Sequence, residues 1–135
     1  MPPQTHSAID PRLVGTPLDL ADGSAQVVLV TVPEMAADGR GLVHGGFVFG
    51  LADYAAMLAV NHPNVVLGSS EVRFLKPVVV GERLVASALV DPAAERGAKK
   101  IRVQAVVRRG EEEVLTGSFT CFTPERHVLD GREGV

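Results

Sequence analysis

Two kinds of chemically useful group lie in one short stretch of the chain, from Gly41 to Val60. His44-Gly45-Gly46 opens a run of apolar and small residues, and Asp53 is the only formal charge in the stretch. Glycines at the start of a helix leave the first backbone N–H groups free to donate to a ligand that comes close. An isolated carboxylate among apolar side chains is normally paired, protonated or used in chemistry. The stretch therefore offers oriented amide donors and one acid on the same helix.

These groups match the needs of a reaction that builds negative charge on an oxygen atom. Amides at the positive end of a helix stabilise such charge, and a carboxylate partly shielded from water can act as general base or nucleophile. His44 and Asp53 are nine residues apart, which is about 13 Å along a straight helix. A direct Asp–His pair within one chain is therefore not expected.

The element that must carry these groups is a helix from Phe47 to Val60. Nearly all of its residues are apolar or small, and a helix that is apolar all round is surrounded by protein. The run is shorter than the ~20 residues a membrane-spanning helix needs, and Asp53 interrupts it. Pro63 cannot continue a helix, so the helix is expected to end at Asn61-His62.

Strand patterns surround this helix. Before it, Leu18–Ala21 and Gln26–Val32 flank an Asp22-Gly23 turn signal, and Pro33–Arg40 reads as a loop. After it come four alternating segments, which are Val65–Lys76, Arg83–Val90, Lys99–Arg108 and Val114–Thr123. Alternation gives each strand one core face and one solvent face, with Val72 and Phe74 on the core face. Short connections favour antiparallel pairing, so the predicted fold class is α+β, an antiparallel sheet curled around one long helix.

Length and composition set the wider frame. At 135 residues the chain is predicted to be a single domain, with an irregular N-terminal arm at 1–12 and a C-terminal extension at 124–135. The net charge of −3 argues against nucleic-acid binding. One cysteine, Cys121, allows no internal disulfide, and no Cys/His cluster has metal-site spacing. No secretion signal or membrane-surface segment is evident, so a cytoplasmic location is expected.

The motifs resemble those of the hotdog-fold acyl-CoA thioesterases, in particular the phenylacetate-pathway (PaaI-like) branch. They are Gly41-x-x-His44-Gly45-Gly46, Leu51-Ala52-Asp53, and Val72-x-Phe74-Leu75-x-Pro77 followed by Gly81. The resemblance extends from about Val27 to Phe122. It implies a homodimer, often assembled into a dimer of dimers, with the active site at the dimer interface. It implies no cofactor, since coenzyme A is part of the substrate.

The resemblance also assigns roles. Gly46, or a neighbouring amide of one subunit, would bind the thioester carbonyl, and Asp53 of the partner subunit would act as base or nucleophile. His44 completes the predicted catalytic set. The acyl chain would enter a tunnel along the helix. Coenzyme A would lie on the surface, with its phosphates near basic residues. The predicted substrate-binding residues are Gly45, Asn61, Ser69, Ser70, Arg73 and Lys76.

Each residue also has a structural interpretation. His44 could hold its loop by bonding a backbone group, and the glycines could serve close packing alone. Asn61 could simply form a polar helix end. The register of Ser69 and Ser70 is ambiguous, and Arg73 and Lys76 also suit a solvated strand face.

Two functional hypotheses follow. The first is hydrolysis of an acyl-CoA or aryl-CoA thioester. The alternative is a non-catalytic acyl-CoA or lipid-binding module of the same fold, which would tolerate Asp53→Ala.

Overall fold

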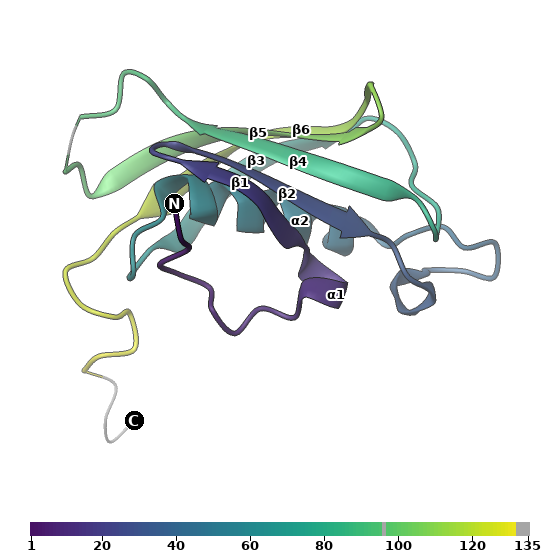
Figure 1. The fold of residues 1–135 in the computed structure, drawn as a ribbon, viewed down its shortest axis with the longest axis horizontal. Coiled ribbons are helices and arrows are strands. Elements are labelled where there is room, and N and C mark those ends of the chain that lie inside the picture. Colours follow the sequence, from purple (N-terminus) through teal and green to yellow (C-terminus); the bar gives the residue numbers. More distant parts are fainter. Residues whose placement is uncertain (96, 132–135) are drawn as a thin grey trace.

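The computed structural model describes residues 1–95 and 97–131. One long helix lies against a six-stranded antiparallel sheet, the architecture that the sequence predicted (Figure 1). The order of strands across the sheet is β1-β2-β4-β5-β6-β3. The strands are β1 (Thr16–Ala21), β2 (Ser24–Val30), β3 (Val66–Phe74), β4 (Arg83–Val90), β5 (Lys100–Arg109) and β6 (Glu112–Phe122). The helices are α1 (Pro11–Val14), η1 (Pro33–Met35) and α2 (Gly45–Val60).

Helix α2 begins and ends through specific caps. The ring of His44 caps its start, and Asn61 ends it in the left-handed conformation with φ of 52°. The helix thus begins two residues before Phe47, where the sequence pattern placed its start. Most of its side chains are buried against the inner face of the sheet. The sheet on one side explains why α2 is apolar over so much of its surface.

Strand β3 lies at the edge of the sheet. In the described part of the chain it pairs with β6 alone. Phe74 pairs with the buried Leu115 and so lies on the predicted inner face. It is nevertheless 57% exposed, and Val72 is only partly buried. The alternation of side chains is as predicted, but α2 covers the inner side of β3 only in part.

The two ends of the chain take different paths. The first ten residues pass below α2 in the view of Figure 1 and lead into α1, a helical turn that sequence analysis had left within the irregular arm. The predicted loop at 33–40 contains the turn η1. The C-terminal extension leaves the sheet after β6 (Figure 1), and its residues 132–135 lie outside the described residues.

Two features are absent from the residues that the structure describes. Among the described residues, no helix has the length and apolarity that crossing a membrane requires. Within the same residues, no cluster of three or more His, Cys, Asp or Glu side chains is placed to hold a metal ion.

Candidate active site

The start of α2 carries a cap formed by an imidazole. His44 Nδ1 accepts a hydrogen bond from the amide of Gly46, at 2.8 Å. A Cβ atom at Gly46 would lie 2.8 Å from the same nitrogen, so glycine is required for the ring to sit there. The backbone amide of Gly46 therefore already donates to His44. It is the amide that the sequence analysis put first as a donor to substrate.

The neighbouring amide is free. Phe47 N donates to the His44 carbonyl at 3.0 Å, whereas the amide of Gly45 has no acceptor in the described part of the chain. It lies at the positive end of a 16-residue helix. The sequence analysis predicted Gly46 or a neighbouring amide as the donor to substrate. In the described chain, Gly45 is the neighbouring amide that remains available to donate.

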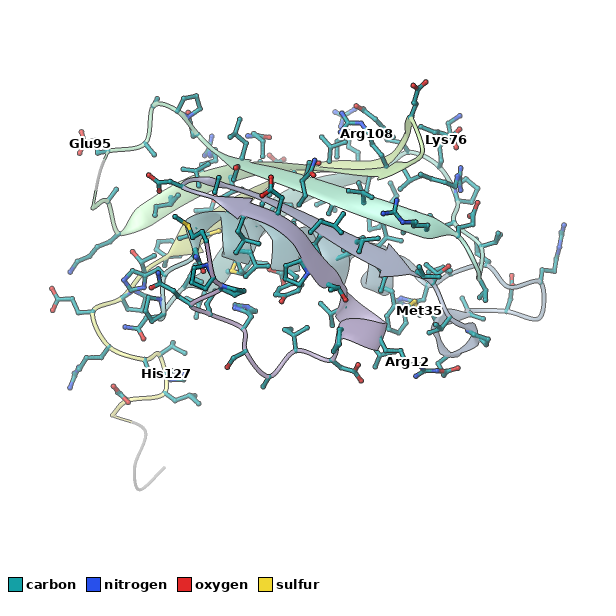
Figure 2. All side chains as sticks on the ribbon, in the orientation of Figure 1. Arg12, Met35, Lys76, Glu95, Arg108 and His127 are labelled. Carbon is teal, nitrogen blue, oxygen red and sulfur yellow. The ribbon has the colours of Figure 1, made fainter. Side chains whose placement is uncertain are left out.

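An apolar cavity of about 330 Å³ adjoins this donor. Gly45 lines it, and a Cβ at Gly45 would be 3.1 Å from the ring of Phe74. Lys76 also lines the cavity, and its side chain lies near the end of the β5–β6 hairpin (Figure 2). The remaining lining residues are Leu42, Val43, Val48, Leu75, Pro77 and Val78. A free amide donor thus lies beside an apolar hollow whose lining includes a lysine, and binding sites for small molecules commonly combine an apolar lining with a few polar groups.

Asp53 is half-buried on α2, within electrostatic reach of Cys121 on β6. In the described residues, its Oδ1 atom is shielded from solvent and has no hydrogen-bond partner. Burial raises the pKa of this carboxyl to about 6. A buried carboxylate without a partner is costly, and a structural acid would normally have one.

Three residues, Asp53 and two glycines, form an open face on a helix whose side chains are mostly buried. Gly46 and Gly50 precede Asp53 by seven and three residues, so all three share one face. Gly46 is exposed, and Gly50 and Asp53 are intermediate. A Cβ added at Gly50 would meet nothing within 4 Å in the described chain. We call Gly46, Gly50 and Asp53 the open face of α2.

The chain is related to known thioesterases. A family model described as "Thioesterase superfamily" matches residues 40–116, more than half of the chain and the whole of α2. The chain belongs to the thioesterase superfamily. The predicted hotdog fold and the resemblance to its PaaI-like branch are therefore confirmed.

Solved structures of the superfamily's fold superpose closely on this chain. Protein PH1136 of Pyrococcus horikoshii is 54% identical, with a TM-score of 0.91, over 96% of this chain and 98% of that one. A mutant of the phenylacetic acid degradation protein PaaI of Thermus thermophilus is 27% identical, with a TM-score of 0.73, over 83% of this chain and 95% of that one.

Curated relatives are longer than this thioesterase-superfamily chain. A methylthioribose-1-phosphate isomerase of Aquifex aeolicus is 49% identical over 116 residues, covering 86% of this chain and 25% of that protein. Transcription factor FapR of Exiguobacterium sibiricum is 32% identical over 112 residues, covering 82% of this chain and 58% of that protein. The chain thus spans a quarter of the first relative and less than two thirds of the second.

The two candidate serines point to opposite faces of the sheet. Ser70 pairs with Phe119, whose side chain is in the core, whereas Ser69 pairs with Thr120 on the outer face. An irregularity between Leu67 and Ser69 sets this register. In this superfamily member Ser70 therefore lies on the α2 side of β3, and Ser69 does not.

Arg73 lies on the outer face as well. It pairs with Thr116 and lines a hollow of about 620 Å³ with Glu71 and Ser118. Since the sheet separates this hollow from Asp53, one chain does not bring Arg73 and the acid together.

Asn61 has a different set of contacts from the one predicted. Its Oδ1 accepts from the amide of Gln4 at 2.7 Å, and its Nδ2 donates to the Pro2 carbonyl at 3.0 Å. Both side-chain polar groups therefore hold the N-terminal arm rather than face the open face of α2.

Cys121 lies within the electrostatic reach of Asp53 and is fully buried. Burial, and secondarily the charge of Asp53, raise the pKa of this thiol to about 12. A buried, protonated thiol is a poor nucleophile, and Cys121 is a residue of the core.

Sequence reasoning missed two residues of this site, Phe74 as a neighbour of Gly45 and Gly50 as part of the open face. Gly50 had a detectable signal, because an interior helix glycine is unfavourable relative to alanine by up to about 1 kcal/mol and calls for a reason. Phe74 had none, since its contact depends on long-range packing.

Proposed function

We propose that the chain hydrolyses an acyl-CoA or aryl-CoA thioester to the free acid and coenzyme A, as a homodimer with shared active sites. The observation that carries this proposal is the half-buried Asp53 on an open helix face, whose Oδ1 has no hydrogen-bond partner among the described residues. The free amide of Gly45 at the start of the same helix supplies the second group.

A second copy of the chain is needed to bring the two groups together. Gly45 and Asp53 are eight residues apart on one continuous helix, a rise of about 12 Å. A thioester carbonyl cannot contact both ends of that interval, but a two-fold axis can place the Gly45 amide of one subunit beside the partner's acid. The unpaired edge of β3 in the described chain supports pairing between copies. A dimer of dimers follows as a further part of the proposal.

The proposed reaction has two steps, the addition of water and the collapse of the tetrahedral intermediate. The Asp53 carboxylate accepts a proton from water as the water oxygen bonds to the thioester carbon, and the Gly45 amide donates to the developing oxyanion. The tetrahedral intermediate collapses with cleavage of the C–S bond, and the departing thiolate takes up the proton that Asp53 accepted, which restores the carboxylate. In the alternative route, the Asp53 carboxylate attacks the carbon itself, and the C–S bond breaks with release of the coenzyme A thiolate, which takes a proton from solvent. Water then hydrolyses the mixed anhydride to the free acid and regenerates the Asp53 carboxylate.

The other predicted residues receive supporting roles. His44 holds the start of α2 through Gly46, leaving Gly45 free. Ser70 lies on the inner side of β3 and would hold water or substrate. Lys76 would contact the phosphates of coenzyme A, as would Arg73 and Ser69, which lie on the outer face of the sheet. No cofactor is part of the proposed mechanism.

The alternative is a binding module without catalysis. It is favoured by the FapR match, because that relative is a transcription factor and not a hydrolase by name. In such a module Asp53 would contact a ligand or remain protonated, and its replacement would not abolish binding.

Thiol release from a panel of short, long and aromatic acyl-CoA thioesters decides between the two. Wild type should release coenzyme A from at least one class, and Asp53→Asn should lose at least ~100-fold. Asp19→Asn is the matched control, since Asp19 is an exposed acid on the sheet. If no thioester is cleaved but acyl-CoA raises the melting temperature, the binding module is correct. Equal release by all three proteins would remove Asp53 from the mechanism.

A further inference from the structure

Arg109 joins the β5–β6 hairpin to the β3–β4 loop, residues 75–82. It is the last residue of β5, and its Nη1 atom donates to the Pro77 carbonyl at 2.8 Å and to Glu82 Oε1 at 2.9 Å. Its Nη2 atom contacts Glu112 at the start of β6. One guanidinium group therefore binds a hairpin neighbour and two residues that lie 32 and 27 positions earlier in the chain.

The β3–β4 loop supplies much of the wall of the cavity beside Gly45. Four consecutive residues of the loop line this cavity of about 330 Å³, which are Leu75, Lys76, Pro77 and Val78. Arg109 is not one of the lining residues in the described chain. A substitution of Arg109 therefore reaches the cavity through the loop.

Pro77 is the part of this wall that the guanidinium holds. Before it, the Leu75 amide donates to the Val114 carbonyl at 2.9 Å. After it, the Val78 carbonyl accepts from the Val43 amide at 2.8 Å. Pro77 itself has no N–H group, so within the described chain its backbone is hydrogen-bonded through the guanidinium alone.

Glu82 fixes the loop end of this contact. Its Oε1 atom accepts from the Val79 amide at 2.7 Å as well as from Arg109. The buried hydroxyl of Thr31 donates to the carbonyls of Val79 and Glu82, at 2.9 and 3.1 Å. The ion pair between Arg109 and Glu82 thus has a defined geometry, unlike a pair of free surface side chains.

The lining of the cavity suits an acyl group better than the pantetheine arm of coenzyme A. Apart from Lys76, every lining residue is apolar or glycine. The pantetheine arm carries amide groups, and burying an amide without a partner is costly. A thioester whose carbonyl accepts from the Gly45 amide would therefore place its acyl group in this cavity.

We propose that Arg109 is a positioning residue, which holds the loop wall of the cavity in place and so sets how closely the acyl group is packed. The inference rests on the proposed function of Gly45 as the donor to the thioester. Without the bond to Pro77, the wall at 76–78 is free to shift, and a gap of about 0.5–1 Å already forfeits a quarter to a half of the dispersion attraction. The acyl groups that fit best should lose most.

The hairpin offers a matched pair of substitutions. Arg108 pairs with Glu113 at 3.2 Å, one position along the same hairpin, and in the described chain this ion pair includes no residue of the loop. Arg109→Met and Arg108→Met therefore each remove one arginine and one ion pair of the hairpin. Only Arg109→Met also releases Pro77. A loss of hairpin stability alone would affect both variants alike.

The first measurement is binding without catalysis. S-(2-oxoalkyl)-CoA analogues keep a carbonyl but have no thioester bond to hydrolyse, and a panel of them runs from small to bulky groups. Well below the melting temperature, Arg109→Met should weaken the tightest-bound analogue by about 10-fold, the equivalent of losing contact with two methylenes, and should narrow the spread of dissociation constants. Arg108→Met should match wild type. Wild-type affinities in Arg109→Met, or equal losses in both variants, would overturn the proposal.

The two carboxylates bound by Arg109 give a second test if Arg109→Met does not fold. Glu82→Gln weakens the loop side of the contact, whereas Glu112→Gln weakens only the hairpin side. Glu82→Gln should raise the dissociation constant of the best analogue about threefold, and Glu112→Gln should leave it unchanged. Equal effects of the two substitutions, or no effect of Glu82→Gln, would contradict a role exerted through the loop.

Hydrolysis distinguishes this role from the proposed function. Where a thioester is cleaved, Arg109→Met should raise KM about 10-fold with little change in kcat, because the wall binds ground state and transition state alike. Cleavage with an unchanged KM would keep the hydrolase and overturn the role of Arg109. No cleavage by wild type, together with weaker analogue binding by Arg109→Met alone, would refute the hydrolase and retain that role.

Discussion

His44 and Gly46 are joined by a hydrogen bond of 2.8 Å from the glycine amide to the imidazole Nδ1. The two residues stand at the first turn of α2, and the bond leaves Gly45 as the neighbouring amide without an acceptor in the described chain. His44 thus caps the start of α2. Any effect of His44 on a substrate would come from the way it positions Gly45.

This relationship predicts how substitutions at His44 separate capping from catalysis. His44→Ala should lower the free energy of unfolding by about 1 kcal/mol through loss of the cap, whereas His44→Asn should restore it. If the ring acts only as a cap, His44→Asn should also keep most of the activity, measured as kcat/KM with the best thioester. A variant as stable as wild type but at least ~100-fold slower would show instead that the imidazole contacts the reacting groups.

Asp53 predicts an acid limb in the pH profile. Burial raises the pKa of its carboxyl from 3.8 to about 6, and a general base must be ionised. Activity should therefore fall about tenfold per pH unit below pH 6, measured as kcat/KM between pH 4.5 and 8.5. An acid limb near pH 4 would mean that Asp53 is solvated in the working enzyme or is not the base.

The same shift makes a prediction for stability. Since the pKa of Asp53 is higher in the folded state, ionisation disfavours folding as the pH rises from about 4 to 6. Asp53→Asn should therefore raise the free energy of unfolding by about 2 kcal/mol at pH 8, after allowance for partial exposure, and by nothing near pH 3.5. Thermal melts across that pH range test this. A variant that loses both activity and stability at pH 8 would identify Asp53 as a structural acid.

The periodicity of the sequence was enough to predict the fold. The strand at Arg83–Val90 has the predicted bounds, and α2 ends at Asn61 as Pro63 required. Alternation and helical apolarity are local signals of burial, so they are visible in the chain without the structure.

The site was less accessible to sequence reasoning, because its details depend on contacts between distant segments. Asn61 accepts a hydrogen bond from the backbone of Gln4, which lies 57 residues earlier in the chain. The sequence around neither residue predicts this contact. Ser69 and Ser70 could be assigned to faces only from the irregular pairing of β3 with β6. The choice between the amides of Gly45 and Gly46 depended on the side-chain conformation of His44.

Gly50 predicts what covers the open face of α2. In one chain a Cβ there meets nothing within 4 Å, so Gly50→Ala should stabilise the isolated fold by up to about 1 kcal/mol through helix propensity. If the partner subunit or the acyl group packs on this face, Gly50→Leu should weaken the dimer or raise KM while Gly50→Ala changes little. Sedimentation and steady-state kinetics measure both. A Gly50→Leu protein with native mass and kinetics would show that this face remains in solvent.

A shared active site predicts complementation between two inactive variants. Gly45→Pro removes the amide donor, and proline is tolerated at the first position of a helix. It also suits the extended conformation of His44, with φ of −61° and ψ of 130°. Gly45→Ala is the control, because it adds the same Cβ beside Phe74 but keeps the N–H group. Each of the variants Gly45→Pro and Asp53→Asn alone should be at least ~100-fold slower than wild type.

Heterodimers of the two variants should recover activity. In one with Gly45→Pro in one subunit and Asp53→Asn in the other, one of the two sites combines an intact Gly45 with an intact Asp53. Purified through two different tags, this heterodimer should have about half the wild-type kcat, since one site of a two-fold pair is complete. If both groups acted within one chain, each subunit would lack one of them and the heterodimer would stay as slow as its parents. That result would overturn the shared site. The role of Asp53 would then be judged from the activity of Asp53→Asn alone.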